Sequence, residues 1–298
     1  MSTSLIQGTL TGITPNVPWP AAQDRPKPRF RTARACASPS CPHKGKLWPS
    51  WLRIVSPIEF GGRTYCGPEC FAPALEERVR RLQTGFVNAT TKQNRMPLGL
   101  LLLQRGLFSQ TQLREALRRQ REAGKGKIGY WLQELGLIDE QNLTSALAQQ
   151  YGCPTFPLER LASPLELEQL LPLTLLESVC AVPAYAGSNT GALYLAFGDR
   201  VDRSTLFAIE QMLGRPTIGC VAKQSVVCEL LEQYRRTTTR NEIHFESMRE
   251  TGEITRTVYN YARELKAQRI TALSTRNYIW ARLHRLSSSR DLLFRMIR

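Results

Sequence analysis

A 24-residue stretch occurs twice in this chain, and the second copy begins thirty residues after the first. Residues 97–120 read PLGLLLLQRGLFSQTQLREALRRQ, and residues 127–150 read KIGYWLQELGLIDEQNLTSALAQQ. Eight of the 24 aligned positions are identical, and several others are conservative changes. A duplication of this kind predicts one local structure that is built twice, with the two copies packed on a shared core.

Each copy predicts a helical hairpin. A short apolar helix ends at Gly106 or Gly136, and a second helix starts at Ser109 or Asp139. Ser109 followed three residues later by Gln112 is a capping-box pattern, and Asp139 is a favourable N-cap residue. The residues that share one face of the second helix are Leu113, Ala116, Leu117 and Gln120 in the first copy, and Leu143, Ala146, Leu147 and Gln150 in the second.

The remaining segments make the chain an expected α+β, multi-domain protein. The expected divisions are a disordered lead over 1–30, a zinc-binding module with a helix over 31–84, the repeat with a small α/β unit over 95–235, a linker over 236–253, and a helix with three strands over 254–298. Within the third division we expect helices over 163–171, 202–212 and 224–234 and strands over 179–185, 192–197 and 217–221. The last 45 residues would be marginally stable alone.

Four of the eight cysteines form two close pairs, Cys36 with Cys41 and Cys66 with Cys70. Two such pairs supply the four soft ligands that zinc binds tetrahedrally, and a closed four-thiolate site has no open position for water. The spacing therefore predicts a structural zinc ion. His43 could compete with Cys41, and four unrelated buried cysteines are the alternative interpretation.

The N-terminal residues and the apolar runs of the chain bear on its cellular location. The N-terminal residues lack a charged start and a long apolar core, which favours a cytoplasmic protein without a secretory signal. No apolar run approaches the roughly 18 residues of a membrane span. Disulfides are rare in a reducing compartment, so the single cysteines at 153, 180, 220 and 228 are expected to pack in cores.

The net charge of +15 lies at the two ends of the chain. Residues 25–53 carry eight Lys or Arg and no acid, and residues 256–298 carry ten Lys or Arg against two acids. Basic patches attract the phosphates of nucleic acids, lipid headgroups or nucleotides. Solubility and contact with an acidic protein are the alternative explanation.

The duplicated motif resembles the MshEN domain, found at the N-terminus of type II secretion and type IV pilus assembly ATPases, the GspE family. The family pattern is Arg-Leu-Gly-x-x-Leu-x-x-x-Gly-Leu-x5-Leu-x3-Leu-x2-Gln. The resemblance covers about residues 95–234 and includes VPAYAGSNTGALYLAFGD and LLEQY. Two long motifs in register make it specific for the fold.

Family members with the full motif bind cyclic di-GMP, one motif for each half of the ligand. The resemblance implies that the binding residues are Leu98, Gly99, Leu113, Leu117 and Gln120, then Ile128, Gly129, Leu143, Leu147 and Gln150, with Arg95, Lys127 and Asp199 beside them. Glycine permits close backbone approach, leucine covers apolar ligand faces, and glutamine can bond a guanine edge. The first motif position departs from the family, because its arginine is replaced by Pro97 and Lys127. Arg95 is a candidate replacement.

The C-terminal segment YARELKAQRITALSTRNYIWARLHRLSSSRDLLFR is similar to the segment that precedes the motor domain of those ATPases. No Gly-x4-Gly-Lys-Ser/Thr motif or other catalytic constellation occurs. We therefore expect a non-catalytic regulator or adaptor that binds cyclic di-GMP or docks to a secretion or pilus apparatus, with a separate ATPase as one candidate partner. The alternative hypothesis is a zinc-dependent nucleic-acid-binding protein that uses its two basic ends.

Overall fold

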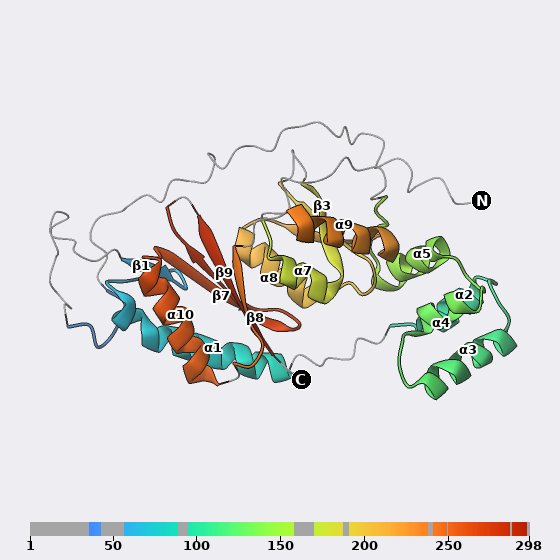
Figure 1. Cartoon of the computed structure of the whole chain (residues 1–298), viewed down its shortest axis with the longest axis horizontal. Coiled ribbons are helices and arrows are strands. Elements are labelled where there is room, and N and C mark those ends of the chain that lie inside the picture. The colour runs from blue at the N-terminus through green and yellow to red at the C-terminus, as the bar shows by residue number, and fades with distance from the viewer. Residues whose placement is uncertain are drawn as a thin grey trace.

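The structure is a computed structural model that describes residues 36–42, 57–88, 95–157, 170–186, 191–237, 241–248, 250–286 and 288–296. The expected lead over 1–30 and most of the expected helix over 163–171 lie outside these residues. Among the helices described, none combines the length and the apolar character that crossing a bilayer requires. Two sheets and a helical repeat organise the described residues (Figure 1).

The larger sheet has six strands in the order β2-β1-β7-β8-β9-β6. Its strands are β1 (Ile58–Phe60), β2 (Arg63–Tyr65), β6 (Glu242–Phe245), β7 (Arg269–Ser274), β8 (Tyr278–His284) and β9 (Ser289–Arg295). The helices α1 (Pro68–Asn88) and α10 (Thr251–Glu264) pack on one face of it, as Figure 1 shows. Strands from both ends of the chain therefore share one sheet.

The central strand β8 is buried on both of its faces. Ile279 and Leu283 point into the core under α1 and α10, whereas Tyr278 and Trp280 point into the core of the smaller sheet. A strand covered on both sides reads as a nearly continuous apolar run rather than an alternating one. This explains the sequence YIWARL and shows that the smaller unit lies against the open face of the larger sheet.

The larger sheet differs from the divisions expected from the sequence. β1 of the cysteine module pairs in parallel with β7 of the C-terminal part, so residues 31–84 and 254–298 contribute to one unit. Residues 236–253, expected to be a linker, include β6, which pairs in parallel with β9. Both pairings join segments far apart in the sequence through backbone hydrogen bonds, which side-chain periodicity does not reveal.

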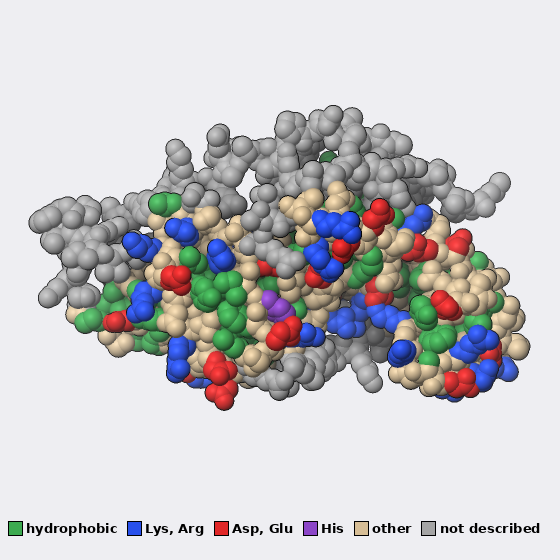
Figure 2. Space-filling view, in the orientation of Figure 1, with side chains coloured by type: hydrophobic (Ala, Val, Ile, Leu, Met, Phe, Trp, Pro, Cys, Tyr) green, Lys and Arg blue, Asp and Glu red, His purple; other side chains and the backbone are tan. Residues whose placement is uncertain are grey.

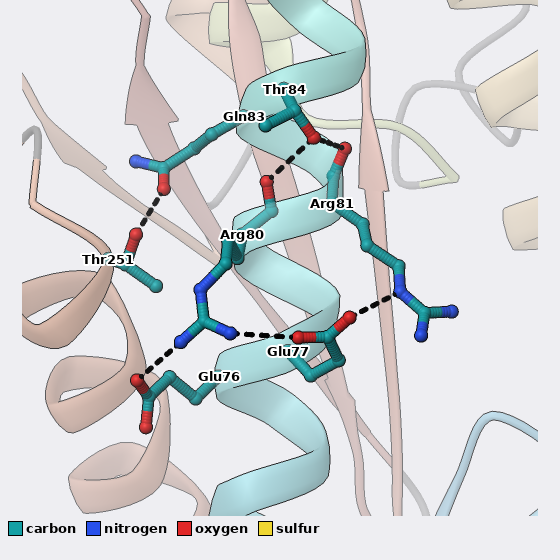
Figure 3. A network of polar contacts seen from close by, with 7 residues as sticks. All are labelled: Glu76, Glu77, Arg80, Arg81, Gln83, Thr84 and Thr251. Atoms are coloured by element: carbon teal, nitrogen blue, oxygen red, sulfur yellow. Dashed lines mark hydrogen bonds and ion pairs between the residues drawn. The ribbon is translucent and has the colours of Figure 1, made fainter.

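The exposed side of α1 carries a ladder of charged side chains (Figure 3). Arg80 pairs with Glu76 and Glu77, and Thr251 at the start of α10 donates a hydrogen bond to Gln83. Exposed ion pairs contribute only about 0–1 kcal/mol each. The buried apolar face of α1, and not this ladder, therefore holds the helix to the sheet.

The smaller sheet has the order β3-β4-β5, with β3 and β4 antiparallel and β4 and β5 parallel. Its elements are α7 (Leu173–Val179), β3 (Ala181–Ala186), β4 (Leu193–Phe197), α8 (Arg203–Leu213), β5 (Thr217–Val221) and α9 (Gln224–Thr237). Asp202 caps α8 by accepting a hydrogen bond from the Thr205 amide, and Gly214 ends the helix at φ 66°. Both cap assignments confirm the sequence prediction.

One expected strand in this unit starts two residues later than predicted. The strand expected over 179–185 begins only at Ala181, because α7 extends to Val179 and Cys180 ends the helix with a φ of 48°. Positive φ is uncommon for a residue with a side chain. The turn at Cys180 was therefore not foreseeable from a sequence that offers no glycine there.

Candidate functional site

The repeat folds into two helical hairpins, as predicted. Its helices are α2 (Leu98–Gln104), α3 (Gln110–Ala123), α4 (Ile128–Glu134) and α5 (Glu140–Tyr151). Ser109 and Gln112 form a complete capping box on α3, and Asp139 caps α5 by accepting from the Asn142 amide at 2.6 Å. α2 and α4 each end two residues before a glycine of positive φ, Gly106 and Gly136.

The two hairpins meet at their paired glycines. A Cβ atom added to Gly99 would lie 2.9 Å from the Leu113 side chain, and one added to Gly129 would lie 2.9 Å from that of Leu143. Each glycine also faces the first helix of the other copy, Gly99 facing Ile128 and Gly129 facing Leu98. Glycine at these positions lets the two copies pack closely in a twofold-like arrangement.

The repeated glutamines make reciprocal bonds between the copies. Gln120 of the first copy donates from Nε2 to the Gly126 carbonyl at 2.9 Å, and Gln150 of the second donates to the Met96 carbonyl at 2.8 Å. Gly126 and Met96 occupy equivalent positions, each directly before the first residue of a motif. Each glutamine therefore fixes the backbone just before the first helix of the other copy.

The first copy contains an apolar hollow of about 240 Å³. Its lining includes all five ligand residues expected in that copy together with one from the second. The lining residues are Pro97, Leu98, Gly99, Leu100, Leu113, Leu117, Gln120 and Ile128. The structure thus brings the candidate residues of the first copy around one opening.

The candidate residues of the second copy have different surroundings. Leu147 is buried in the core of the smaller sheet, and Leu143 packs against the same core. Arg95, the candidate replacement for the missing arginine, places its guanidinium 4.1 Å from the ring centroid of Tyr151 and does not line the hollow.

Lys127 lies at a second, polar cavity of about 230 Å³. It forms an ion pair with Asp199, the acidic residue that the family resemblance placed near the ligand. The end of α7, Arg200, Arg276 and Asn277 complete the wall. Arg276 comes from the turn between β7 and β8, far from Lys127 in the sequence, and no sequence motif connects it with this site. The only feature of the sequence that pointed to Arg276 was the excess of basic residues in the C-terminal part.

The four paired cysteines come together as predicted. Their Sγ atoms all lie within 4.8 Å of one another, with 3.6 Å between Cys41 and Cys66 and 3.4 Å between Cys66 and Cys70. Four sulfurs around a zinc ion at about 2.3 Å would be about 3.8 Å apart. The donor set and its spacing therefore fit a tetrahedral thiolate site. His43, the possible competitor, lies outside the described residues.

The cysteine thiols influence one another's ionisation. Burial, together with the neighbouring cysteines, raises the pKa of Cys66 and raises that of Cys70 to about 11. Burial opposes ionisation of Cys36 as well, but hydrogen bonds from the backbone N–H groups of Cys66 and Ser38 lower its pKa overall. Crowded thiols of this kind lose their protons readily only when a cation neutralises them.

The basic side chains do not form one continuous stripe on the face that Figure 2 shows. Lys and Arg are interspersed with Asp and Glu over the helical repeat and over the larger sheet, and several lie around the notch beside the repeat (Figure 2). The view gives no support for a single extended basic groove on this face.

Comparisons with known proteins identify relatives for part of the chain. No protein-family model matches it. It is 30% identical over 117 residues to the type IV pilus assembly ATPase PilB of Thermus thermophilus, covering 39% of the chain and 13% of the relative. It is 29% identical over 140 residues to PilB of Myxococcus xanthus, covering 46% of the chain and 24% of the relative.

Two solved structures also match part of the chain. A structure of MshE with cdg (cyclic di-GMP) is 28% identical, covers 47% of the chain and 99% of its own length, and gives a TM-score of 0.38. The N-terminal domain of XpsE is 25% identical, covers 48% and 98%, and gives a TM-score of 0.37. On the duplicated motif and the similarity to the PilB proteins, this chain contains a domain of the MshEN type, related to the N-terminal domains of the GspE family of secretion and pilus ATPases.

Proposed function

We propose that the chain is a non-catalytic regulator or adaptor of a type II secretion or type IV pilus apparatus and that its repeat binds cyclic di-GMP. The hollow of the first copy carries this proposal. It gathers Leu98, Gly99, Leu113, Leu117 and Gln120 around one opening. These are the residues that the family motif assigns to one half of the ligand.

The chemistry of the hollow suits one guanine base of such a ligand. Its leucine side chains offer an apolar surface for a base face, which is favourable because apolar contact removes that face from water. Gln120 uses its amide nitrogen to bond Gly126, so its amide oxygen remains an acceptor at the rim. Guanine presents N–H donors on its Watson–Crick edge, and these could donate to that oxygen.

The phosphates of the ligand would need positive charge, and Lys127 supplies it at the first position of the second motif. Its ammonium group can meet a phosphate as a point charge, although it lacks the fork of a guanidinium. Asp199 already pairs with Lys127, so a phosphate would have to share the ammonium group with this carboxylate. We therefore expect the chain to bind cyclic di-GMP specifically, but more weakly than a motif that keeps its arginine.

Calorimetric titration of the full chain with cyclic di-GMP tests this function, with GTP as the control ligand. We expect saturable binding of cyclic di-GMP that weakens about tenfold in Gln120→Ala, since a lost hydrogen bond with the ligand is worth about 1.4 kcal/mol. Gln110→Ala is the matched control, because Gln110 is exposed on the same helix and does not line the hollow.

Absence of binding in the full chain would overturn the ligand assignment and leave the repeat as a docking scaffold. Salt-dependent retention on DNA would instead favour the nucleic-acid hypothesis, because phosphate contacts release counterions. Co-purification with a secretion or pilus ATPase tests the adaptor role independently of the ligand.

We also propose that the four-cysteine cluster holds a structural zinc ion through Cys36, Cys41, Cys66 and Cys70. The ion would fasten the segment before the larger sheet to β2 and to the first turn of α1, where Cys70 lies. The Ala37 amide already donates to the Thr64 carbonyl at 2.9 Å across the same gap. The metal would thus tie the N-terminal segment to the sheet.

Metal analysis of the purified chain tests this site. We expect one zinc per chain, lost in a Cys66→Ser, Cys70→Ser double variant and kept in the control Cys228→Ser, whose thiol is exposed and outside the cluster. Zinc retention should fall as the pH is lowered, because protons compete for the thiolates. Full zinc content in the double variant would disprove the ligand set.

A further inference from the structure

The polar cavity beside Lys127 lies where three parts of the molecule meet. Lys127 comes from the repeat, Asp199 and Arg200 follow β4 of the smaller sheet, and Arg276 and Asn277 form the turn between β7 and β8 of the larger sheet. A ligand group in this cavity could therefore touch all three parts at once. The MshEN-type repeat alone would provide only one of these walls.

The charges around the cavity leave a positive excess. Asp199 is neutralised by Lys127, and Glu177 is neutralised by Arg235, which bonds it at 2.8 Å. Arg200 and Arg276 form no ion pair within the described part of the chain. Partial burial, followed by repulsion from Arg276 and Arg200, lowers the pKa of Lys127, although about two-thirds of its side chain is exposed. The cavity is thus electropositive.

The turn that carries Arg276 is held in place by hydrogen bonds. Thr275 is buried, its amide donates to the Tyr278 carbonyl at 2.8 Å, and its hydroxyl accepts from the Tyr278 amide. Asn277 donates to the Ser178 carbonyl at the end of α7, at 3.2 Å. A guanidinium on a turn fixed in this way loses less freedom on binding than one on a mobile loop.

We infer that Arg276 is a further phosphate-binding residue of the cyclic di-GMP site, and that the bound ligand thereby fastens the repeat to the six-stranded sheet. This inference rests on the function proposed above. Guanidinium groups bind phosphate oxygens in a bidentate way that an ammonium cannot match. Arg276 would restore, from a distant part of the sequence, the guanidinium that the motif lacks at Lys127.

The inference is tested by comparing two arginines at opposite ends of β8. Arg276 precedes the strand at the cavity, and Arg285 follows it in an exposed turn, roughly 25–30 Å away at the rise of a strand. We expect Arg276→Gln to weaken cyclic di-GMP binding about tenfold. Arg285→Gln should change it less than about twofold, and Arg276→Lys should restore part of the loss. Equal thermal unfolding of the variants would verify that each is folded.

Amide hydrogen exchange provides a measurement that a general loss of positive charge would not change. Cyclic di-GMP should slow amide exchange in the turn over 275–278 of the unaltered chain, and this protection should disappear in Arg276→Gln. If the ligand binds and Gln120→Ala weakens it, but Arg276→Gln behaves like Arg285→Gln, the inference fails while the proposed function stands. If the unaltered chain binds no cyclic di-GMP, both fail.

Discussion

The two copies of the repeat have the same fold but different surroundings. In the first copy, α3 buries only Leu113 and Ala116. In the second copy, α5 buries four residues, including Leu147 and Ala148, which belong to the core of the smaller sheet. The comparison teaches that one motif can serve as the wall of a hollow in one copy and as an anchor in the other.

The charged residues follow the same division. The exposed side of α3 carries ion pairs among Glu115, Arg118 and Glu122, whereas the side of α5 toward the smaller sheet is apolar. Glu140, at the start of α5, accepts hydrogen bonds from the amide and hydroxyl of Ser225 on α9. The second copy is thereby attached to the α/β unit, whereas the outer side of α3 in the first copy faces solvent.

The largest expected effect separates the aligned leucines of the two copies. Leu147→Ala should lower the free energy of unfolding by about 2–5 kcal/mol, because it removes side-chain volume from a closed core. Leu117→Ala should cost about 1 kcal/mol or less, since Leu117 is only half-buried at the hollow. Urea unfolding followed by circular dichroism measures both values. Equal losses would mean that the two copies are buried alike.

The next effect concerns the caps, which should be alike in the two copies. Ser109→Ala and Asp139→Ala each remove a hydrogen bond to the N3 amide of an α-helix, and each should cost about 0.5–2 kcal/mol. The measurement is the same urea midpoint. Thr111→Ala, at an exposed position of α3 beyond the cap, serves as the control. A loss confined to one copy would break the equivalence of the hairpins.

A smaller effect is expected from the reciprocal glutamines. Gln120→Ala and Gln150→Ala should each lower the free energy of unfolding by about 0.5–1.5 kcal/mol, because each removes one hydrogen bond to a backbone carbonyl. The two losses should agree within about 0.5 kcal/mol. Amide exchange near residues 96 and 126 would show whether each variant loosens the segment that its glutamine holds.

The smallest effect is expected at the paired glycines. Alanine at Gly99 or Gly129 gains about 1 kcal/mol of helix propensity, but its methyl group must displace the tip of Leu113 or Leu143. The gain in helix propensity and the cost of moving the leucine oppose each other. The free energy of unfolding of both variants should therefore lie within about 1 kcal/mol of that of the unaltered chain. A large loss in either copy, measured by urea unfolding, would show that the leucine tips cannot move.

Local features of the repeat were predictable because they depend on residues close in sequence. The capping box at Ser109, the cap at Asp139 and the glycines just after α2 and α4 follow from backbone hydrogen bonding within a few residues. The cysteine spacing likewise predicted the cluster at 36, 41, 66 and 70. The bonding partner of Gln150 was not predictable, because Met96 directly precedes the other copy and the contact depends on how the two hairpins cross.

The sequence by itself determined the doubled hairpin, its resemblance to MshEN domains and the grouping of four cysteines, since each depends on a short pattern of residue types. The tertiary structure alone decided that β1, β6 and the C-terminal strands form one sheet, and that Arg276 reaches the cavity at Lys127. Strand pairing between distant segments uses backbone groups that every residue carries. No local pattern specifies such a partner, so only the packed chain could select it.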